Sequence, residues 1–280
     1  MRQTLKPLTG LAAATAATLL FALPAVAGGS LKDTAPAAKE RCSYSANTAL
    51  TTEYIFRGFS QSAGAPAVQG GFDVTCGIFY TGIWASSIDF GKNRLASADS
   101  VAKLEMDWYA GFKPTTGPIS WDFGVIYYTY PNASTLQNNG INANLNYLEL
   151  KAGASFAPWK DATLGQTIFW SPDYQLESGQ AWTFETSFSQ NLPKVGIFSP
   201  TFSALYGYQL GSDTVNYRTA FGNTGHSYSY WNAGLTLGFR EKWALDFRYW
   251  DTNISNAGNF CKGDIFQCDQ RYVASLKFTF

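Results

Sequence analysis

Bulky apolar side chains recur at every second position along most of the chain. The stretch 101–113 shows the pattern well, because Met106 and Trp108 share one parity while Glu105 and Asp107 share the other. Successive side chains of a β-strand point to opposite faces, whereas a helix would scatter these charges around its circumference. The pattern therefore predicts strands with one apolar face and one charged face.

Twelve segments carry this alternation, and clusters of Gly, Pro, Asn or Asp separate them. We expect strands at 44–57, 67–75, 79–90, 101–113, 120–131, 146–156, 162–171, 180–190, 198–209, 227–239, 243–252 and 269–280. The connections alternate in length: the link at 58–66 is long, the turn around Gly77 is short, and the link at 91–100 is long again. Short turns at one end and long loops at the other are typical of outer-membrane barrels. The fold prediction is all-β, a transmembrane antiparallel up-and-down β-barrel of twelve strands over residues 44–280.

The composition supports a wall that faces lipid. Aromatic residues make up 16% of the chain and charged residues only 14%. A soluble β-sandwich or lipocalin-like barrel is the alternative, but its solvent-facing side would need more Lys and Glu than this chain has. The 20 basic and 20 acidic residues balance, so we expect no nucleic-acid partner.

The first 27 residues have the features of an export signal. Arg2 and Lys6 precede an apolar run at 8–23, and the small residues 25–27 follow as an A-x-A cleavage pattern. We expect residues 1–27 to be removed and 28–43 to form a flexible periplasmic arm before the barrel. The predicted location is the cell outer membrane of a Gram-negative bacterium, in contact with outer-membrane lipid.

Three blocks of sequence, in order, resemble the TorF family of porins: FRGFSQ at 56–61, PAVQGGFD at 66–73 and FYTGIWASSIDF at 79–90. Further similarities occur at 105–111, 127–131, 171–174 and 269–275, so the resemblance extends over essentially the whole mature chain. It implies a Gram-negative outer-membrane barrel that acts as a channel. It also implies that the terminal Phe280 is similar to the signal read by the outer-membrane insertion machinery. Neither a solute nor a mechanism follows from it.

The chain contains four cysteines, Cys42, Cys76, Cys261 and Cys268. Export to an oxidising compartment favours disulfides, and three connectivities exist for four cysteines. Their places at the ends of the predicted strands favour Cys42 with Cys76, at the periplasmic rim, and Cys261 with Cys268, in the last outer loop. No histidine or second cysteine cluster accompanies either pair, so we expect no metal site.

His226 is the only histidine and lies in a predicted outer loop. A Ser-His-Asp arrangement would have to unite it with Asp213 and a serine, and the chain has no G-x-S-x-G elbow. We therefore expect a solvated loop residue, no enzyme activity and no cofactor. An outer-membrane hydrolase that uses His226 remains an alternative.

Charged side chains on the second strand face are expected to line the lumen, because an ion in the hydrocarbon span is tolerated only when it faces water or a partner. Arg57, Arg248 and Arg271 should then form a basic seam where the barrel closes, which favours anions unless Glu53 and Asp269 neutralise it. The alternative is that the charges pair across the lumen and brace the wall. The predicted pore-lining residues are Glu53, Arg57, Asp89, Lys103, Glu105, Asp107, Asp122, Glu149, Lys151, Glu185, Asp246, Arg248, Arg271 and Lys277.

These features predict a channel that lets small polar solutes diffuse passively through a charge-lined lumen. The alternative hypothesis is a non-conducting barrel with a structural or surface-binding role, in which charge pairs close the lumen.

Overall fold

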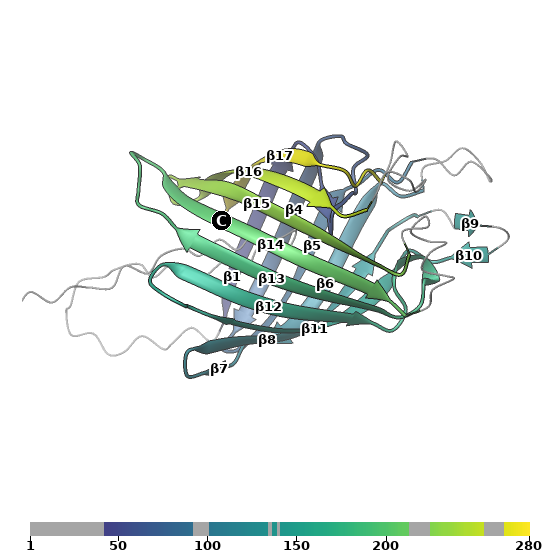
Figure 1. The fold of residues 1–280 in the computed structure, drawn as a ribbon, viewed down its shortest axis with the longest axis horizontal. Coiled ribbons are helices and arrows are strands. Elements are labelled where there is room, and N and C mark those ends of the chain that lie inside the picture. Colours follow the sequence, from purple (N-terminus) through teal and green to yellow (C-terminus); the bar gives the residue numbers. More distant parts are fainter. Residues whose placement is uncertain (1–41, 92–100, 134–135, 139–140, 213–224, 255–265) are drawn as a thin grey trace, which may run out of the picture.

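Twelve long strands form a closed antiparallel barrel, which confirms the predicted fold (Figure 1). The computed structural model describes residues 42–91, 101–133, 136–138, 141–212, 225–254 and 266–280. The long strands are β1 (Ser43–Thr51), β4 (Ala67–Cys76), β5 (Phe79–Ser87), β6 (Leu104–Phe112), β8 (Ile119–Thr129), β11 (Tyr147–Phe156), β12 (Ala162–Ser171), β13 (Ala181–Asn191), β14 (Ser199–Gly211), β15 (Ser227–Phe239), β16 (Trp243–Thr252) and β17 (Arg271–Thr279). Each pairs with its neighbours in chain order, β1 also pairs with β17, and the two-residue β7 (Thr115–Thr116) extends one edge of β8.

The alternating pattern sets the two faces of the wall. On β6, Glu105 and Asp107 are buried inside the barrel, while Trp108, which follows Asp107, has the opposite parity and is 51% exposed. Every charged residue of the long strands has the inward parity, except Asp251 near the end of β16. Large apolar side chains with the opposite parity make the outer surface, among them Leu50, Val68, Phe72, Trp108, Tyr127, Leu150, Phe202, Tyr206, Leu235, Phe247, Tyr272 and Leu276. Such a wall is suited to lipid outside and polar groups inside.

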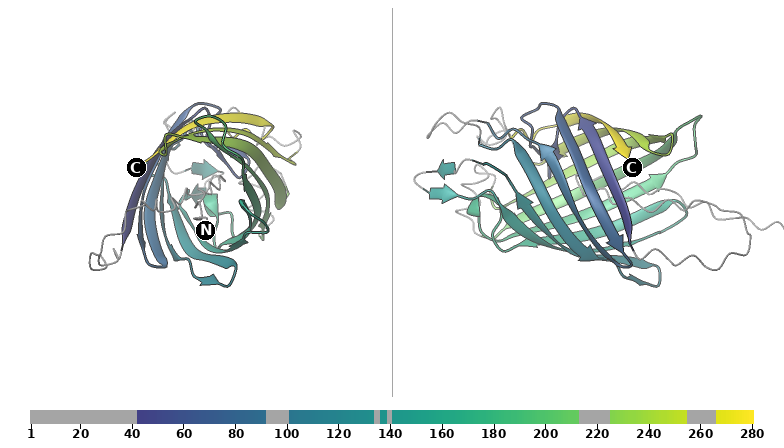
Figure 2. Two further views of the ribbon diagram at one scale, coloured as in Figure 1. Left: turned by 90° about the vertical axis from the view of Figure 1, so that its left-hand side faces the viewer. Right: turned by 180° about the vertical axis from the view of Figure 1, so that it is seen from behind.

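The two ends of the barrel differ in their connections. Near the C terminus the strands join through tight turns, such as Gly77-Ile78 and Arg240-Glu241. Gly77, Arg240 and Glu241 all have positive φ, as narrow hairpin turns require. At the opposite end the links are longer and include 52–66 and 172–180 (Figure 2). We call these the turn end and the loop end.

Short elements lie at the loop end. A small hairpin, β9 (Leu136–Asn138) and β10 (Ile141–Ala143), extends beyond the barrel there (Figure 1). A short 3-10 turn, η1 (Gln175–Glu177), follows β12. In the described part of the chain, no helix is long and apolar enough to cross a membrane.

The first strand is shorter than the predicted strand at 44–57, because β1 ends at Thr51. The chain then turns into the lumen and forms a second small hairpin, β2 (Ile55–Phe56) and β3 (Phe59–Ser60). The alternation of apolar and polar residues continues past Thr51 because the backbone of this hairpin is extended like that of a strand. Its rings pack against the inner wall instead of facing lipid, so the prediction of a continuous spanning strand was wrong.

Candidate functional site in the lumen

The hairpin at 52–66 turns at Arg57 and Gly58. Phe56 pairs with Phe59, and the two residues between them have φ values of 47° and 86°. Positive φ at both central positions defines a type I′ turn, which matches the twist of the flanking strands. A Cβ on Gly58 would lie 2.4 Å from Cγ2 of Thr252, so the close approach of the turn to β16 requires glycine.

Aromatic packing anchors this hairpin to different parts of the wall. The Phe59 ring contacts Tyr228 at 5.2 Å between centroids, and the Phe56 ring lies 5.8 Å from that of Tyr128. The Tyr228 hydroxyl also donates to the backbone oxygen of Arg57, at 3.1 Å. These contacts hold Arg57 in the interior of the barrel.

Arg57 forms a buried bidentate ion pair with Glu149 of β11. The distances are 2.7 Å from Nη1 to Oε1 and 2.8 Å from Nη2 to Oε2, and the two side chains are 3% and 1% exposed. Tyr128 donates a third hydrogen bond to Glu149, and the guanidinium lies over the rings of Phe56 and Phe169 at 4.8 and 4.9 Å. Burial disfavours the charged guanidinium, but the Glu149 carboxylate outweighs it, so the pKa of Arg57 lies well above its ordinary value.

Further carboxylates gather in the same half of the lumen. Tyr54 donates to Oε1 of Glu105 at 3.0 Å, and burial together with the charge of Glu105 raises the pKa of Tyr54 well above its ordinary value. Tyr54 therefore stays protonated and acts only as a donor toward this carboxylate.

Three more acidic residues are buried near this cluster. Glu185 accepts a hydrogen bond from Tyr230 at 2.6 Å. Asp107 and Glu53 are 4% and 8% exposed, and each has one carboxylate oxygen without a hydrogen-bond partner. Carboxylates thus outnumber the guanidinium of Arg57 in the loop-end half of the lumen that the structure describes.

A second charge cluster lies nearer the turn end. Nζ of Lys151 lies 2.8 Å from Oδ2 of Asp122, and Nζ of Lys113 lies 4.0 Å from the same oxygen. Tyr80 donates to Oδ1 of Asp122 at 2.8 Å. Here two ammonium groups share the carboxylate of Asp122, and the buried Asp73, which accepts a hydrogen bond from Tyr109, also acts on Lys113. Acidic and basic groups are therefore equal in number in this cluster, unlike in the loop-end half.

The third cluster lies on the closing strands. Arg248 contacts Asp246 at 3.0 Å, Asn232 at 2.7 Å and Ser203 at 2.9 Å, all from buried positions. Lys277 has the inward parity on the adjoining strand, next to this group. Arg248 is therefore held by partners on its own wall.

The predicted basic seam is not present. Arg57 does not end β1 but crosses to Glu149. Arg271 pairs with Asp269 at 2.6 Å in a partly exposed position, and these side chains are 23% and 50% exposed. The three arginines thus belong to three separate ion pairs and do not line one wall.

Asp89 and Lys103, which are also predicted to line the lumen, pair with each other. Their ion pair at 3.1 Å is exposed, with side-chain exposures of 42% for Asp89 and 62% for Lys103. Both residues lie outside the strands, because β5 ends at Ser87 and β6 begins at Leu104.

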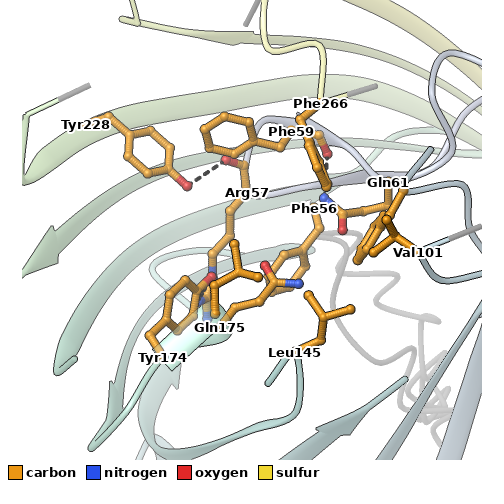
Figure 3. A pocket seen from close by; sticks show the side chains of 12 residues that line it. Phe56, Arg57, Phe59, Gln61, Val101, Leu145, Tyr174, Gln175, Tyr228 and Phe266 are labelled. Carbon is orange, nitrogen blue, oxygen red and sulfur yellow. Dashed lines mark hydrogen bonds between the residues drawn. The ribbon is translucent and has the colours of Figure 1, made fainter. Parts of the chain in front are cut away.

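A pocket opens between the hairpin at 52–66 and the other loop-end segments (Figure 3). Its volume is about 90 Å3. Six rings line it, those of Phe56, Phe59, Phe90, Tyr174, Tyr228 and Phe266. Arg57, Gln61 and Gln175 supply its polar groups, and Val101, Leu145 and Leu176 complete it.

A disulfide joins Cys42 and Cys76 at the turn end, where β1 begins and β4 ends. Cys268 is fully buried and disulfide-bonded. Cys261 lies outside the described residues, so its pairing with Cys268 stays a prediction.

The sequence profile of a bacterial protein family of unknown function, Gcw_chp, matches residues 35–280. The chain belongs to the Gcw_chp family. No curated protein matches this sequence significantly.

Solved structures with a similar fold are outer-membrane barrels. A KdgM porin in complex with disordered oligogalacturonate superposes with a TM-score of 0.50 and 8% identity, over 85% of this chain and 98% of that chain. A NanC porin gives 0.48 and 10% over 85% and 98%, and LpxR from Salmonella typhimurium gives 0.45 and 8% over 84% and 99%. At these identities the likeness to the KdgM porin shows that this Gcw_chp protein shares its fold, and no more.

The histidine of this Gcw_chp chain lies apart from the lumen clusters. His226 is exposed just before β15, and its backbone oxygen accepts a bond from Gly211. Asp213, its hypothetical partner, lies outside the described residues. Within the described part of the chain, no group of three or more His, Cys, Asp or Glu side chains could hold a metal ion.

Reasoning from the sequence missed the tyrosines that partner the inward charges. Tyr54, Tyr128 and Tyr230 all donate to buried carboxylates. Tyr128 on β8 and Tyr230 on β15 have the inward parity, so the alternation in the sequence could have indicated that both face the lumen. The turn at Arg57-Gly58, between two phenylalanines, was the signal for the inward hairpin.

Proposed function

We propose that this protein is a channel in the outer membrane of a Gram-negative bacterium, and that small polar solutes diffuse through its lumen without catalysis or a cofactor. The fold shared with a porin and the apolar outer wall support this location. The turn end would face the periplasm and the loop end the exterior. A relation to the TorF porins, and recognition of Phe280 by the insertion machinery, are parts of the same proposal.

The observation that carries the proposal is the placement of the charges. Apart from Asp251, all charged residues of the twelve strands face the interior, where a barrel of this size leaves room for polar side chains and water. A barrel closed by apolar packing alone would not need ionised groups along its length. The inward parity of these residues therefore supports a hydrated path.

The hairpin at 52–66 would form the constriction of this path. The Arg57–Glu149 pair joins the hairpin to β11 across the interior, and the rings of Phe56 and Phe59 pack on opposite parts of the wall. Solutes would pass beside this group, so only small molecules would fit.

Cations are the solutes that the charge distribution favours. Near the constriction, Glu53, Glu105, Asp107, Glu149 and Glu185 are buried, and only Glu149 among them pairs with the guanidinium of Arg57. In a narrow lumen of reduced dielectric this excess of carboxylates attracts cations more strongly than on an open surface. The proposed preference is opposite to the one that a basic seam would produce.

Planar-bilayer recording of the purified full-length protein tests the channel. Discrete, salt-dependent conductance steps are expected. The gel mobility of unheated and boiled samples should differ, because closed barrels resist detergent until heated. Absence of conductance from correctly folded protein at every salt concentration would exclude the channel.

A non-conducting barrel is the second candidate, and the burial of the hairpin at 52–66 inside the lumen favours it. Arg57 is 3% exposed and is held by two hydrogen bonds to Glu149. If the hairpin closes the lumen completely, the protein would serve a structural or surface-binding role. The same recordings separate the two candidates, since folded but silent protein is the result expected of a closed barrel.

A further inference from the structure

We propose that the loop-end pocket is a binding site for a small neutral aromatic molecule that carries a hydrogen-bond acceptor oxygen. This function concerns binding at the mouth and does not require the lumen to conduct. The pocket volume of about 90 Å3 far exceeds the roughly 10–15 Å3 that one water molecule needs, so a small ring has room to enter.

The pocket walls are suited to a ring. Phe59 comes from the inward hairpin, Tyr228 from β15 and Phe266 from the segment before β17, and all three side chains border the same space (Figure 3). Aromatic side chains from separate segments offer both face and edge contacts to an incoming ring. The aliphatic side chains of Val101 and Leu145 add further apolar wall, beside the polar groups of Arg57, Gln61 and Gln175. Apolar surroundings favour an apolar ligand over trapped water.

One buried donor in this wall lacks an acceptor. Both terminal nitrogens of Arg57 bond to Glu149, but Nε has no hydrogen-bond partner, although the side chain is only 3% exposed. A buried donor left unpaired is costly, and a ligand oxygen would remove that cost. The amides of Gln61 and Gln175 border the same pocket and add polar contacts for such an oxygen.

The charges around the pocket favour a neutral ligand. Glu149 already neutralises Arg57, and the carboxylates of Glu105, Asp107 and Glu185 are buried in the same half of the lumen. The described residues that line the pocket include no carboxylate, and Arg57, their one charged member, already pairs with Glu149. A charged ligand of either sign would therefore lose its hydration without gaining a partner charge, and would bind more weakly than a neutral ring of equal size.

Benzamide is a suitable probe, because it joins one ring to a carbonyl and is neutral. Calorimetric titration of the full-length protein in detergent, with protein-free micelles as the blank, should show saturable binding. Benzoate, its anionic counterpart, should bind at least about tenfold more weakly, and glucose should not bind.

Substitutions that fill the pocket provide the decisive comparison. Val101→Phe and, independently, Leu145→Phe should each weaken benzamide binding about tenfold or more. Val68→Phe places the same side chain on the exposed outer face of β4 and should leave binding unchanged. A gel shift on heating shows which variants have folded.

The proposal would be overturned if the wild-type protein showed no saturable binding of benzamide, or if it bound glucose alone. It would also be overturned if a folded pocket-filling variant bound benzamide with unchanged affinity, or if benzoate bound as tightly as benzamide. None of these depends on conductance, so a silent channel would leave the binding test intact.

Discussion

Arg57 and Glu149 lie 92 residues apart in the chain and form a bidentate ion pair inside the barrel. Glu149 belongs to the wall strand β11, whereas Arg57 is at the tip of a hairpin that leaves β1 and enters the lumen. The pair therefore fixes a loop segment against a distant part of the wall.

Arg57→Ala should widen the lumen and destabilise the hairpin. Removal of one partner leaves the other charge buried and unpaired, which costs about 3–5 kcal/mol for a fully buried pair. We expect a larger single-channel conductance, measured in planar bilayers, and a lower midpoint of thermal unfolding. Arg271→Ala is the matched control, because its pair with Asp269 is partly exposed and exposed pairs contribute about 0–1 kcal/mol. Equal conductance in the wild type and in Arg57→Ala would show that the hairpin does not form the constriction.

Gly58→Ala should loosen the same hairpin without changing any charge. The new Cβ would lie 2.4 Å from Cγ2 of Thr252 and 3.0 Å from Cβ of Tyr230, and such overpacking typically costs about 1–3 kcal/mol. Gly117→Ala is the control, because Gly117 also has positive φ but has no atom within 4 Å of the added Cβ. The free energies of unfolding of the two variants, measured by thermal unfolding, should differ only by the cost of the clash with Thr252 and Tyr230. Equal destabilisation would mean that the turn has room at Thr252.

The sequence predicts the wall of this barrel far better than its interior. The predicted strands at 162–171, 227–239 and 243–252 have the bounds of β12, β15 and β16. Period-two alternation and flanking turn residues are local signals in the sequence. Each strand residue faces either lipid or the polar interior, so the alternation is required along the whole length of a strand.

The hairpin at 52–66 gives the same local signal as a spanning strand, since both are extended and both alternate. What differs is the partner of each apolar ring, lipid in one case and the opposite wall in the other. The pairing of Arg57 with Glu149 is likewise a property of the closed barrel. The parity of Arg57 could suggest that it faces inward, but nothing near it in the sequence specifies β11.

The disulfide between Cys42 and Cys76 should stabilise the start of the barrel. Its cross-link spans a sequence separation of 34 residues, for which loop entropy gives at most about 4 kcal/mol. Cys42→Ser should therefore lower the midpoint of thermal unfolding. Mass mapping of non-reduced peptides should find Cys42 with Cys76 and Cys261 with Cys268. A peptide that links Cys42 to Cys268 would contradict both pairings.

The charge distribution of the constriction predicts a cation-selective channel. Five acidic residues are buried in this part of the lumen and one of them, Glu149, pairs with Arg57, while Glu53 and Asp107 each have an oxygen without a hydrogen-bond partner. A preference of roughly 1 kcal/mol, equivalent to about a fivefold permeability ratio, is expected for K+ over Cl−. The reversal potential in a KCl gradient measures this ratio, and Asp107→Asn should reduce it. Asp269→Asn is the control, because Asp269 is half exposed and pairs with Arg271 away from this group. Asp269→Asn should leave the reversal potential unchanged. A wild-type reversal potential of the sign expected for Cl− would show that the arginines, and not the carboxylates, determine which ions pass.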